Sequence, residues 1–268
     1  MERVARIGMS YTDMRKLSGR LSQLGVTLKE PALPIVGTGF LISEKHPNFP
    51  EVIKIAKDNE LSILMEAKFS RQDYQQASHF TLFGMPKTYP APSDRFRYRE
   101  ITYDSGKACG TCGVGLKQIG PFRFERPVKL KERQIMGLHW VFDEVFVSLP
   151  LSEVFTRFGI KTREVLNSNG KRILADVRQI IVPDIFVPMD GTELRALKCP
   201  SCTSEKYEPR HDIFFPRLDQ TTDAPIFKIK QYIGSGAEAF RQIIINKAVY
   251  EALMAAKTKS AIIDPVAA

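Results

Sequence analysis

Cys109-Gly110-Thr111-Cys112-Gly113 and Cys199-Pro200-Ser201-Cys202 together contain all four cysteines of the chain. Each C-x2-C pair places two thiols about one turn apart, and two such turns complete a tetrahedral site of four thiolates. Gly113 favours this interpretation, since such turns often need a residue that tolerates a positive φ. The pattern predicts one structural zinc ion bound by Cys109, Cys112, Cys199 and Cys202.

The two pairs are far apart in the sequence, with 86 residues between Cys112 and Cys199. A compact zinc ribbon has roughly 15–20 residues between its pairs. The free energy of loop closure grows only logarithmically with length, so a ribbon element with a large insertion is permissible. Two alternatives stay open: a redox dithiol, although neither pair has the strand–helix context of that motif, and four unrelated buried cysteines. A filled four-cysteine site is structural and gives no reason to expect an enzyme.

Length and composition predict an ordinary globular protein. The 268 residues suit one elaborated domain or two domains, and we expect an N-terminal α+β region at 1–105 and a zinc-ribbon-containing α+β region at 106–268, unless the two are continuous. The net charge of +9 is spread along the chain, which is weak evidence for nucleic-acid binding and equally compatible with an acidic protein partner. No targeting segment or membrane-spanning apolar run is visible, so we expect a soluble, cytoplasmic protein.

Short elements of both kinds are expected, which predicts the α+β class with mostly short antiparallel strands and a few helices. Val52–Ala56 suggests a helix and Leu61–Leu64 a buried strand. Strand formers at 140–142 and 145–147 are separated by Asp143-Glu144, and Ser152 can cap a helix that Gly159 ends. The Asn169-Gly170 turn predicts a hairpin of 163–166 with 173–182, and a last helix is expected around 246–257.

Aromatic and charged side chains near the first cysteine pair are the candidate binding residues. Arg95-Phe96-Arg97-Tyr98-Arg99 alternates with period two, which predicts a strand with Arg95, Arg97 and Arg99 on one face. With the basic residues between 117 and 133 they would form a phosphate-binding surface, or simply a charged solvent face. Asp143 and Glu144 fit a solvated turn first, a recognition edge beside Trp140 second, and acid–base catalysis a distant third.

The arrangement resembles the double-CXXCG family of bacterial proteins, many of which are immunity proteins of polymorphic toxin systems. The resemblance rests on the two cysteine pairs, on Trp140-Val141-Phe142-Asp143, and on the run Ile243–Lys247 that leads to Tyr250, Leu253 and Pro265-Val266. It extends from the first cysteine pair to the C-terminus, and it departs at Thr203, where a glycine would follow Cys202, and in the basic charge. It implies a zinc-organised platform that grips a cognate toxin without turnover.

Two functional hypotheses follow. The first is a non-enzymatic, zinc-stabilised protein-binding module, such as a bacterial immunity protein that neutralises a toxin, and it predicts an exposed aromatic and charged face without a deep polar pocket. The alternative is a zinc-ribbon nucleic-acid-binding protein, which predicts that Arg95, Arg97, Arg99 and the basic residues at 117–133 share one surface. An enzyme would need a cleft with convergent titratable groups, which the sequence does not reveal.

Overall fold

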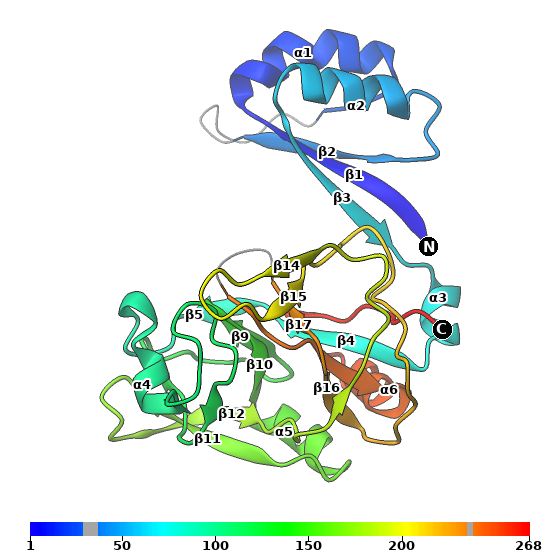
Figure 1. Cartoon of the computed structure of the whole chain (residues 1–268). Coiled ribbons are helices and arrows are strands. Elements are labelled where there is room, and N and C mark those ends of the chain that lie inside the picture. Colours follow the sequence, from blue (N-terminus) through cyan, green and yellow to red (C-terminus); the bar gives the residue numbers. More distant parts are fainter. Residues whose placement is uncertain (29–36, 235–237) are drawn as a thin grey trace. The chain divides into compact units, whose positions relative to one another are not determined.

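The computed structural model describes residues 1–28, 37–234 and 238–268 (Figure 1). The chain forms two compact units, and both combine helices with short, mostly antiparallel strands, so the predicted α+β class is confirmed. Unit 1 comprises Met1–Gln75 and Arg210–Phe214, and unit 2 comprises Gln76–Pro209 and Phe215–Ala268. Residues 76–105 therefore belong with the unit that contains the cysteines.

Unit 1 is a three-stranded antiparallel sheet with two helices on one face (Figure 1). The strands lie in the order β2-β1-β3, where β1 is Glu2–Met9, β2 is Thr38–Ser43 and β3 is Ser62–Lys68. The helices are α1, Tyr11–Gln23, and α2, Phe49–Asp58, and α3, Arg71–Gln76, follows the sheet. Alternate residues of β1 are buried together with the apolar stripes of both helices, as the periods of two and 3.6 require. The predicted helix near Val52 is thus confirmed. A strand also forms where one was predicted near Leu61, but it is not buried, since Leu64 is 45% exposed.

Local signals fix the start of α1 and the return of the chain to unit 1. Ser10 and Asp13 form a capping box, in which each side chain accepts a hydrogen bond from the other residue's backbone N–H. The segment Arg210–Phe214 is joined to β1 and β3, because Arg3 donates to Asp212 at 2.8 Å and the Ala67 N–H donates to the His211 carbonyl at 2.6 Å.

Unit 2 contains two larger sheets and two small ones. The six-stranded sheet has the order β5-β9-β10-β12-β11-β8. Its strands are Pro86–Thr88 (β5), Arg123–Phe124 (β8), Ile135–Leu138 (β9), Val141–Ser148 (β10), Thr162–Asn167 (β11) and Ile173–Ile180 (β12). The five-stranded sheet has the order β13-β16-β18-β4-β19. Its strands are His79–Gly84 (β4), Phe186–Val187 (β13), Ile226–Ile229 (β16), Ile243–Asn246 (β18) and Ala261–Ile262 (β19).

The small sheets and the helices complete unit 2. One small sheet pairs β6, Tyr103–Asp104, with β7, Lys117–Gln118, and the other has the order β14-β15-β17. The strands of the latter are Ala196–Lys198 (β14), Glu205–Tyr207 (β15) and Tyr232–Ile233 (β17). The helical elements are a 3₁₀ turn at Asp94–Phe96, α4 at Tyr98–Thr102, α5 at Leu149–Thr156 and α6 at Lys247–Ala255. None of the helices in the described part of the chain has the length and apolar character that a membrane crossing needs.

The two larger sheets approach each other closely at a pair of glycines. A Cβ atom on Gly84 of β4 would lie 2.3 Å from the carbonyl carbon of Met136, and one on Gly137 would lie 2.4 Å from the Gly84 oxygen. Only residues without a side chain fit there. The close approach brings β4 and its neighbours against β9 and β10, so side chains from both sheets can meet.

In unit 2 the predicted hairpin and last helix are confirmed, the helix before Gly159 forms with an earlier start, and two predictions are wrong. The hairpin forms as β11 and β12, and the last helix forms as α6 with Asn246 as its N-cap. Arg95–Arg99 is helical rather than a strand, because Tyr98 and Arg99 are both buried, which an alternating strand on a surface would not allow. Residues 141–148 form one strand, so Asp143-Glu144 is no turn. The fifth helix begins after Ser148, with a proline in its first turn, and not at Ser152.

Candidate metal centre and the adjoining pocket

The four cysteines meet in unit 2. Their sulfur atoms all lie within 4.8 Å of one another, and the closest pairs across the two turns are Cys109–Cys199 at 4.0 Å and Cys112–Cys202 at 3.7 Å. Sulfurs at the corners of a tetrahedron with metal–sulfur distances of about 2.3 Å would be about 3.8 Å apart. The predicted set of ligands is therefore assembled, with a spacing that suits a metal ion.

The two C-x2-C turns repeat one backbone geometry. The Cys109 carbonyl accepts from Gly113 N–H at 2.9 Å, and the Cys199 carbonyl accepts from Thr203 N–H at 2.9 Å. Each turn connects two antiparallel strands, β6 with β7 and β14 with β15. The hydroxyls of the residues before the second cysteines, Thr111 and Ser201, are 2.7 Å apart and join the turns directly. The site is thus built from two equivalent halves that come from distant parts of the sequence.

The residue after the second cysteine has a left-handed backbone in both turns, with φ of +78° at Gly113 and +59° at Thr203. Glycine adopts this conformation without strain, whereas a β-branched residue does so at a cost of about 1–2 kcal/mol. The absence of a glycine after Cys202 therefore leaves the geometry intact and adds strain.

Thr203→Gly is expected to raise the free energy of unfolding of unit 2 by about 1 kcal/mol, because it relieves this strain. Denaturant unfolding followed by tryptophan fluorescence measures the change. Thr111→Gly is the matched control, since Thr111 has no positive φ, and it should destabilise the protein. A decrease in stability for Thr203→Gly would contradict the strain.

Backbone donors in each turn favour the thiolate at its first cysteine. The N–H groups of Cys112 and Thr111 lower the pKa of Cys109 to about 6, and those of Cys202 and Ser201 lower the pKa of Cys199. Burial raises the pKa of Cys112 to about 12. The turns therefore favour loss of the proton at the first cysteine of each pair.

Buried polar contacts tie the first turn to its surroundings. Arg99, which is buried, donates to the Gly110 carbonyl at 3.2 Å and to the Glu238 carboxylate at 3.4 Å. The Ala239 N–H donates to the Cys112 carbonyl at 2.9 Å, and Lys206 donates to the Glu238 carbonyl at 3.1 Å. The position of Glu238 and Ala239 therefore depends on the cysteine turn.

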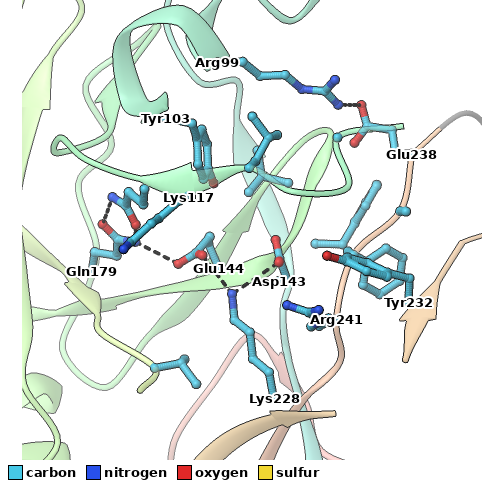
Figure 2. A pocket seen from close by; sticks show the side chains of 18 of the residues that line it. Arg99, Tyr103, Lys117, Asp143, Glu144, Gln179, Lys228, Tyr232, Glu238 and Arg241 are labelled. Carbon is cyan, nitrogen blue, oxygen red and sulfur yellow. Dashed lines mark hydrogen bonds and ion pairs between the residues drawn. The ribbon is translucent and has the colours of Figure 1, made fainter. Parts of the chain in front are cut away.

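A pocket of about 330 Å³ adjoins the cysteine turn in unit 2, and Gly113 and Ala239 line it together with residues of both larger sheets. Figure 2 shows a cluster at its floor, where Asp143 and Glu144 of β10 point toward Lys228 of β16. Lys228 donates to Asp143 at 3.2 Å and to Glu144 at 3.0 Å. Such a pocket lies within the size range of ligand-binding sites.

A bulge explains how two neighbouring acids reach one lysine. Adjacent residues on a regular strand point to opposite faces. The register of β10 against β9 shifts between Val141 and Phe146, and such a bulge re-aims the side chains within it. Both carboxylates consequently point toward β16.

A hydrogen-bond chain of amides holds Glu144 on its other side (Figure 2). Gln179 donates to Glu144 at 2.8 Å, and the amides of Gln179 and Gln118 donate to each other at 2.8 and 2.9 Å. Gln118 also donates to the Gly120 carbonyl. Since Glu144 and Gln179 are buried, each polar group there needs these partners.

Burial and charge shift the titration of the pocket groups. Burial raises the pKa of Glu144, which Lys228 partly offsets, and burial raises the pKa of Glu238 to about 7. Burial disfavours the charged lysine, but the charges of Asp143 and Glu144 raise the pKa of Lys228. Burial also raises the pKa of Tyr103. Lys228 is therefore protonated at neutral pH and is no base.

The candidate binding residues are divided between the pocket and the surface. Trp140, Asp143 and Glu144 line the pocket, and Glu144 is buried, so its interpretation as a solvated acid is wrong. Arg97 is exposed and pairs with Glu100, whereas Arg99 is buried, so these two do not share a face. The side chain of Arg95 lies outside the part of the chain that the structure describes. The pocket also contradicts the prediction of a surface without a deep polar cavity.

Sequence reasoning missed the pocket partners Lys228, Gln118, Gln179 and Glu238. One signal was available, because Lys228 interrupts the apolar strand Ile226–Ile229, and a charge within such a run requires a buried partner. No local signal identified that partner as the acids of β10, which belong to the other sheet.

Comparison with known proteins adds no relative: no family model, no curated protein and no solved structure matches this chain.

Proposed function

We propose that the chain is a non-enzymatic protein-binding module whose binding pocket is held in shape by a structural zinc ion. The observation that supports it most is the connection between the four cysteines and the pocket. The turn at Cys109–Cys112 contacts Arg99 and Ala239, and both line the pocket. A metal that fixes the turn would therefore also fix one wall of the pocket.

The donor set favours zinc. Four thiolates in a tetrahedral arrangement select zinc or an iron–sulfur centre rather than calcium or magnesium, which prefer oxygen ligands. All four thiols are free, and a reducing cytoplasm would keep them so. A four-cysteine site leaves no open position for substrate, so its role is structural. It would complete a zinc-ribbon element from two strand-linked turns.

Binding suits the pocket better than catalysis does. Asp143 and Glu144 are paired with Lys228, which holds its proton at neutral pH. Glu238, whose pKa burial raises to about 7, has Arg99 beside it. No serine, histidine or cysteine is among the described pocket-lining residues, so a serine–histidine or cysteine–histidine pair is absent from that lining.

A protein is the proposed partner. The resemblance of the cysteine and Trp140–Asp143 segments to the double-CXXCG family suggests a bacterial immunity protein, with a toxin as that partner. The nucleic-acid alternative needs Arg97 and Arg99 on one basic surface, and Arg99 is turned inward. The toxin assignment is tested by co-expression with the product of a toxin gene adjacent to this one, where growth should be restored.

Elemental analysis by mass spectrometry tests the metal. We expect one zinc per chain in protein purified under reducing conditions, and loss of the zinc in Cys199→Ser, because three thiolates hold the ion far more weakly. Ser201→Ala is the matched control, since it changes the same turn without removing a ligand, and it should keep the zinc. Freshly reduced protein without metal would overturn the proposal and favour redox chemistry of the two pairs.

A further inference from the structure

We propose that hydrogen peroxide oxidises the four-cysteine site to two disulfides that link its two turns. One disulfide joins Cys109 to Cys199, and the other joins Cys112 to Cys202. The inference rests on the proposed function in one respect, namely that the reduced site contains zinc. It adds a covalent modification of the same residues, in which disulfides replace the metal as the link between the turns.

The sulfur atoms of each proposed pair already lie close together across the turns. The Sγ atoms of Cys109 and Cys199 are 4.0 Å apart and those of Cys112 and Cys202 are 3.7 Å apart, and both pairs are in hydrogen-bonding geometry. A disulfide has an S–S distance of about 2.05 Å, so the sulfurs of each pair must approach by about 2 Å. That shift is small compared with the separation of 90 positions in the sequence.

The two turns are also joined next to the sulfurs, so the backbone needs no large movement to bring them together. The hydroxyls of Thr111 and Ser201 are 2.7 Å apart, and each belongs to the residue before the second cysteine of its turn. The turns are equivalent in backbone geometry, because each first cysteine accepts from the N–H four positions later. First cysteine therefore faces first cysteine, and second faces second.

Each pair combines one accessible and one buried sulfur. Cys109 and Cys202 are partly exposed, whereas Cys112 and Cys199 are buried. Peroxide from the solvent reaches the exposed sulfur first, and the thiolate is the form that it attacks. The buried partner is shielded from peroxide and remains a thiolate or thiol that can resolve the oxidised sulfur. This order leads to a disulfide rather than to sulfinic or sulfonic acid.

The reaction balances for each pair. The Cys109 thiolate attacks one peroxide oxygen, the O–O bond breaks, and the departing hydroxide takes up a proton to become water. The Cys199 thiolate then attacks the sulfur of the resulting sulfenic acid, the S–O bond breaks, and a second water forms in the same way. Two electrons pass from sulfur to one peroxide for each disulfide. Two peroxides therefore consume all four thiolates and release the zinc ion.

The oxidised site should preserve what the metal stabilises. A disulfide between Cys109 and Cys199 closes the same long loop as a metal bound by both, and it restricts the unfolded chain in the same way. The turn that contacts Arg99 and Ala239 would stay in place. Disulfides within each turn, from Cys109 to Cys112 and from Cys199 to Cys202, would instead leave the two turns unconnected.

Peptide mapping tests the pairing. The zinc-loaded full chain is treated with two equivalents of hydrogen peroxide, the remaining thiols are blocked with iodoacetamide, and trypsin digestion is performed without reduction. Trypsin cuts at the lysines that flank each cysteine pair, so residues 108–117 and 199–206 are released separately unless a disulfide joins them. We expect the joined peptides by mass spectrometry, with the proposed pairs assigned by fragmentation, and release of the zinc to a chromogenic indicator. Internal disulfides in the separate peptides, sulfinic acids, or unreacted thiols would each overturn the proposal.

Two double variants test the pairing independently. Cys112→Ser with Cys202→Ser keeps the pair Cys109 and Cys199, whereas Cys112→Ser with Cys199→Ser keeps Cys109 and Cys202. The second is the matched control, because it also leaves one cysteine in each turn and removes the same number of metal ligands. Peroxide should form the disulfide at least about fivefold faster in the first variant, where the sulfurs face each other. Equal rates would overturn the pairing, and mapping of the unchanged chain decides the question if either variant does not fold.

Thermal unfolding tests the consequence for stability. The oxidised, zinc-free protein should unfold at least about 5 °C above the chelated, reduced protein, because the disulfides across the turns close a long loop. Bonds within the turns close loops of only four residues and should give much less of that gain. An oxidised protein no more stable than the chelated one would contradict the proposed replacement of the metal.

The two proposals fail separately, because the mapping is repeated on reduced protein without metal. A zinc-loaded chain that yields no disulfides across the turns would contradict the oxidation and leave the zinc-stabilised module standing. A chain that purifies without zinc but forms both disulfides across the turns would contradict the module and support the oxidation.

Discussion

Removing the metal with a chelator is expected to lower the free energy of unfolding of unit 2 by at least about 4 kcal/mol. Cys109 and Cys199 are 90 positions apart, so a metal bound by both would close a long loop. A cross-link over a loop of that length restricts the unfolded chain by about 4–5 kcal/mol in the loop-entropy model developed for disulfides. The metal–thiolate bonds formed on folding add to this value.

The effect should appear as a lower midpoint of thermal unfolding, by roughly 10–15 °C for a unit of this size. Trp140 lies in unit 2, so its fluorescence reports that unit alone. Added zinc should restore the midpoint, and magnesium, which prefers oxygen ligands, should not. The expectation fails if the chelated and zinc-loaded proteins unfold at the same temperature.

The same experiment shows whether a bound metal also maintains the shape of the pocket. Without zinc, the turn at Cys109–Cys112 loses the restraint that positions Arg99 and Ala239, so the pocket should lose its shape before the sheets lose theirs. Trp140 lines the pocket, so its fluorescence should change at chelator concentrations where circular dichroism still shows most of the secondary structure.

The cysteine site was predictable from the sequence because its information is local and chemical. Two C-x2-C spacings specify two turns, and four thiolates specify a tetrahedral ion, so only the closure of the intervening loop had to be assumed. The interpretation extended even to Gly113, whose positive φ the structure bears out. The sequence did not show whether Thr203 could take the place of a glycine after Cys202. In the structure Thr203 adopts the same left-handed conformation, which is unfavourable for a β-branched residue.

Prediction of secondary structure succeeded where the sequence signal was strong and failed where the pattern covered only a few residues. The Asn169-Gly170 turn located the hairpin correctly, and the apolar residues of 246–257 located α6. The five residues Arg95–Arg99 alternate as a strand would, but a window of that length also fits a helical turn. Burial of Arg99 decided the outcome, and it depends on partners at Gly110 and Glu238 that local sequence cannot specify.

The pocket was not predictable, because it depends on how two sheets meet. Asp143 and Glu144 looked like a solvated turn, since nothing near them in sequence offers a counter-charge. Their partner Lys228 is 85 and 84 positions away, in the other sheet, and the bulge that turns both acids toward it is a feature of pairing between strands. Single-sequence patterns contain no information about either.

Replacing Lys228 with methionine is expected to destabilise unit 2 by about 3–5 kcal/mol at neutral pH. The change keeps the apolar length of the side chain and removes its charge, so two neighbouring carboxylates remain in a mostly buried place without a counter-ion. Lys230→Met is the matched control, because Lys230 is exposed next to the same strand, and it should change stability by less than about 0.5 kcal/mol.

The loss should depend on pH with a definite sign. Burial already raises the pKa of Glu144 above its usual value, and loss of Lys228 removes the interaction that lowers it. A carboxyl whose folded pKa exceeds its unfolded value favours the fold below the unfolded pKa, and that contribution is lost as the pH rises through the folded pKa. The difference between the variant and the unchanged protein should therefore be small near pH 4 and grow toward pH 7.

Urea unfolding followed by Trp140 fluorescence at several pH values measures this difference. The double variant Lys228→Met with Glu144→Gln should recover most of the stability at neutral pH, because the remaining acid, Asp143, is partly exposed to water. A loss that stays constant with pH, or a double variant no more stable than Lys228→Met, would mean that the cost arises from packing. In that case the ion pairs between β10 and β16 would not be what stabilises the contact between the two sheets at the pocket.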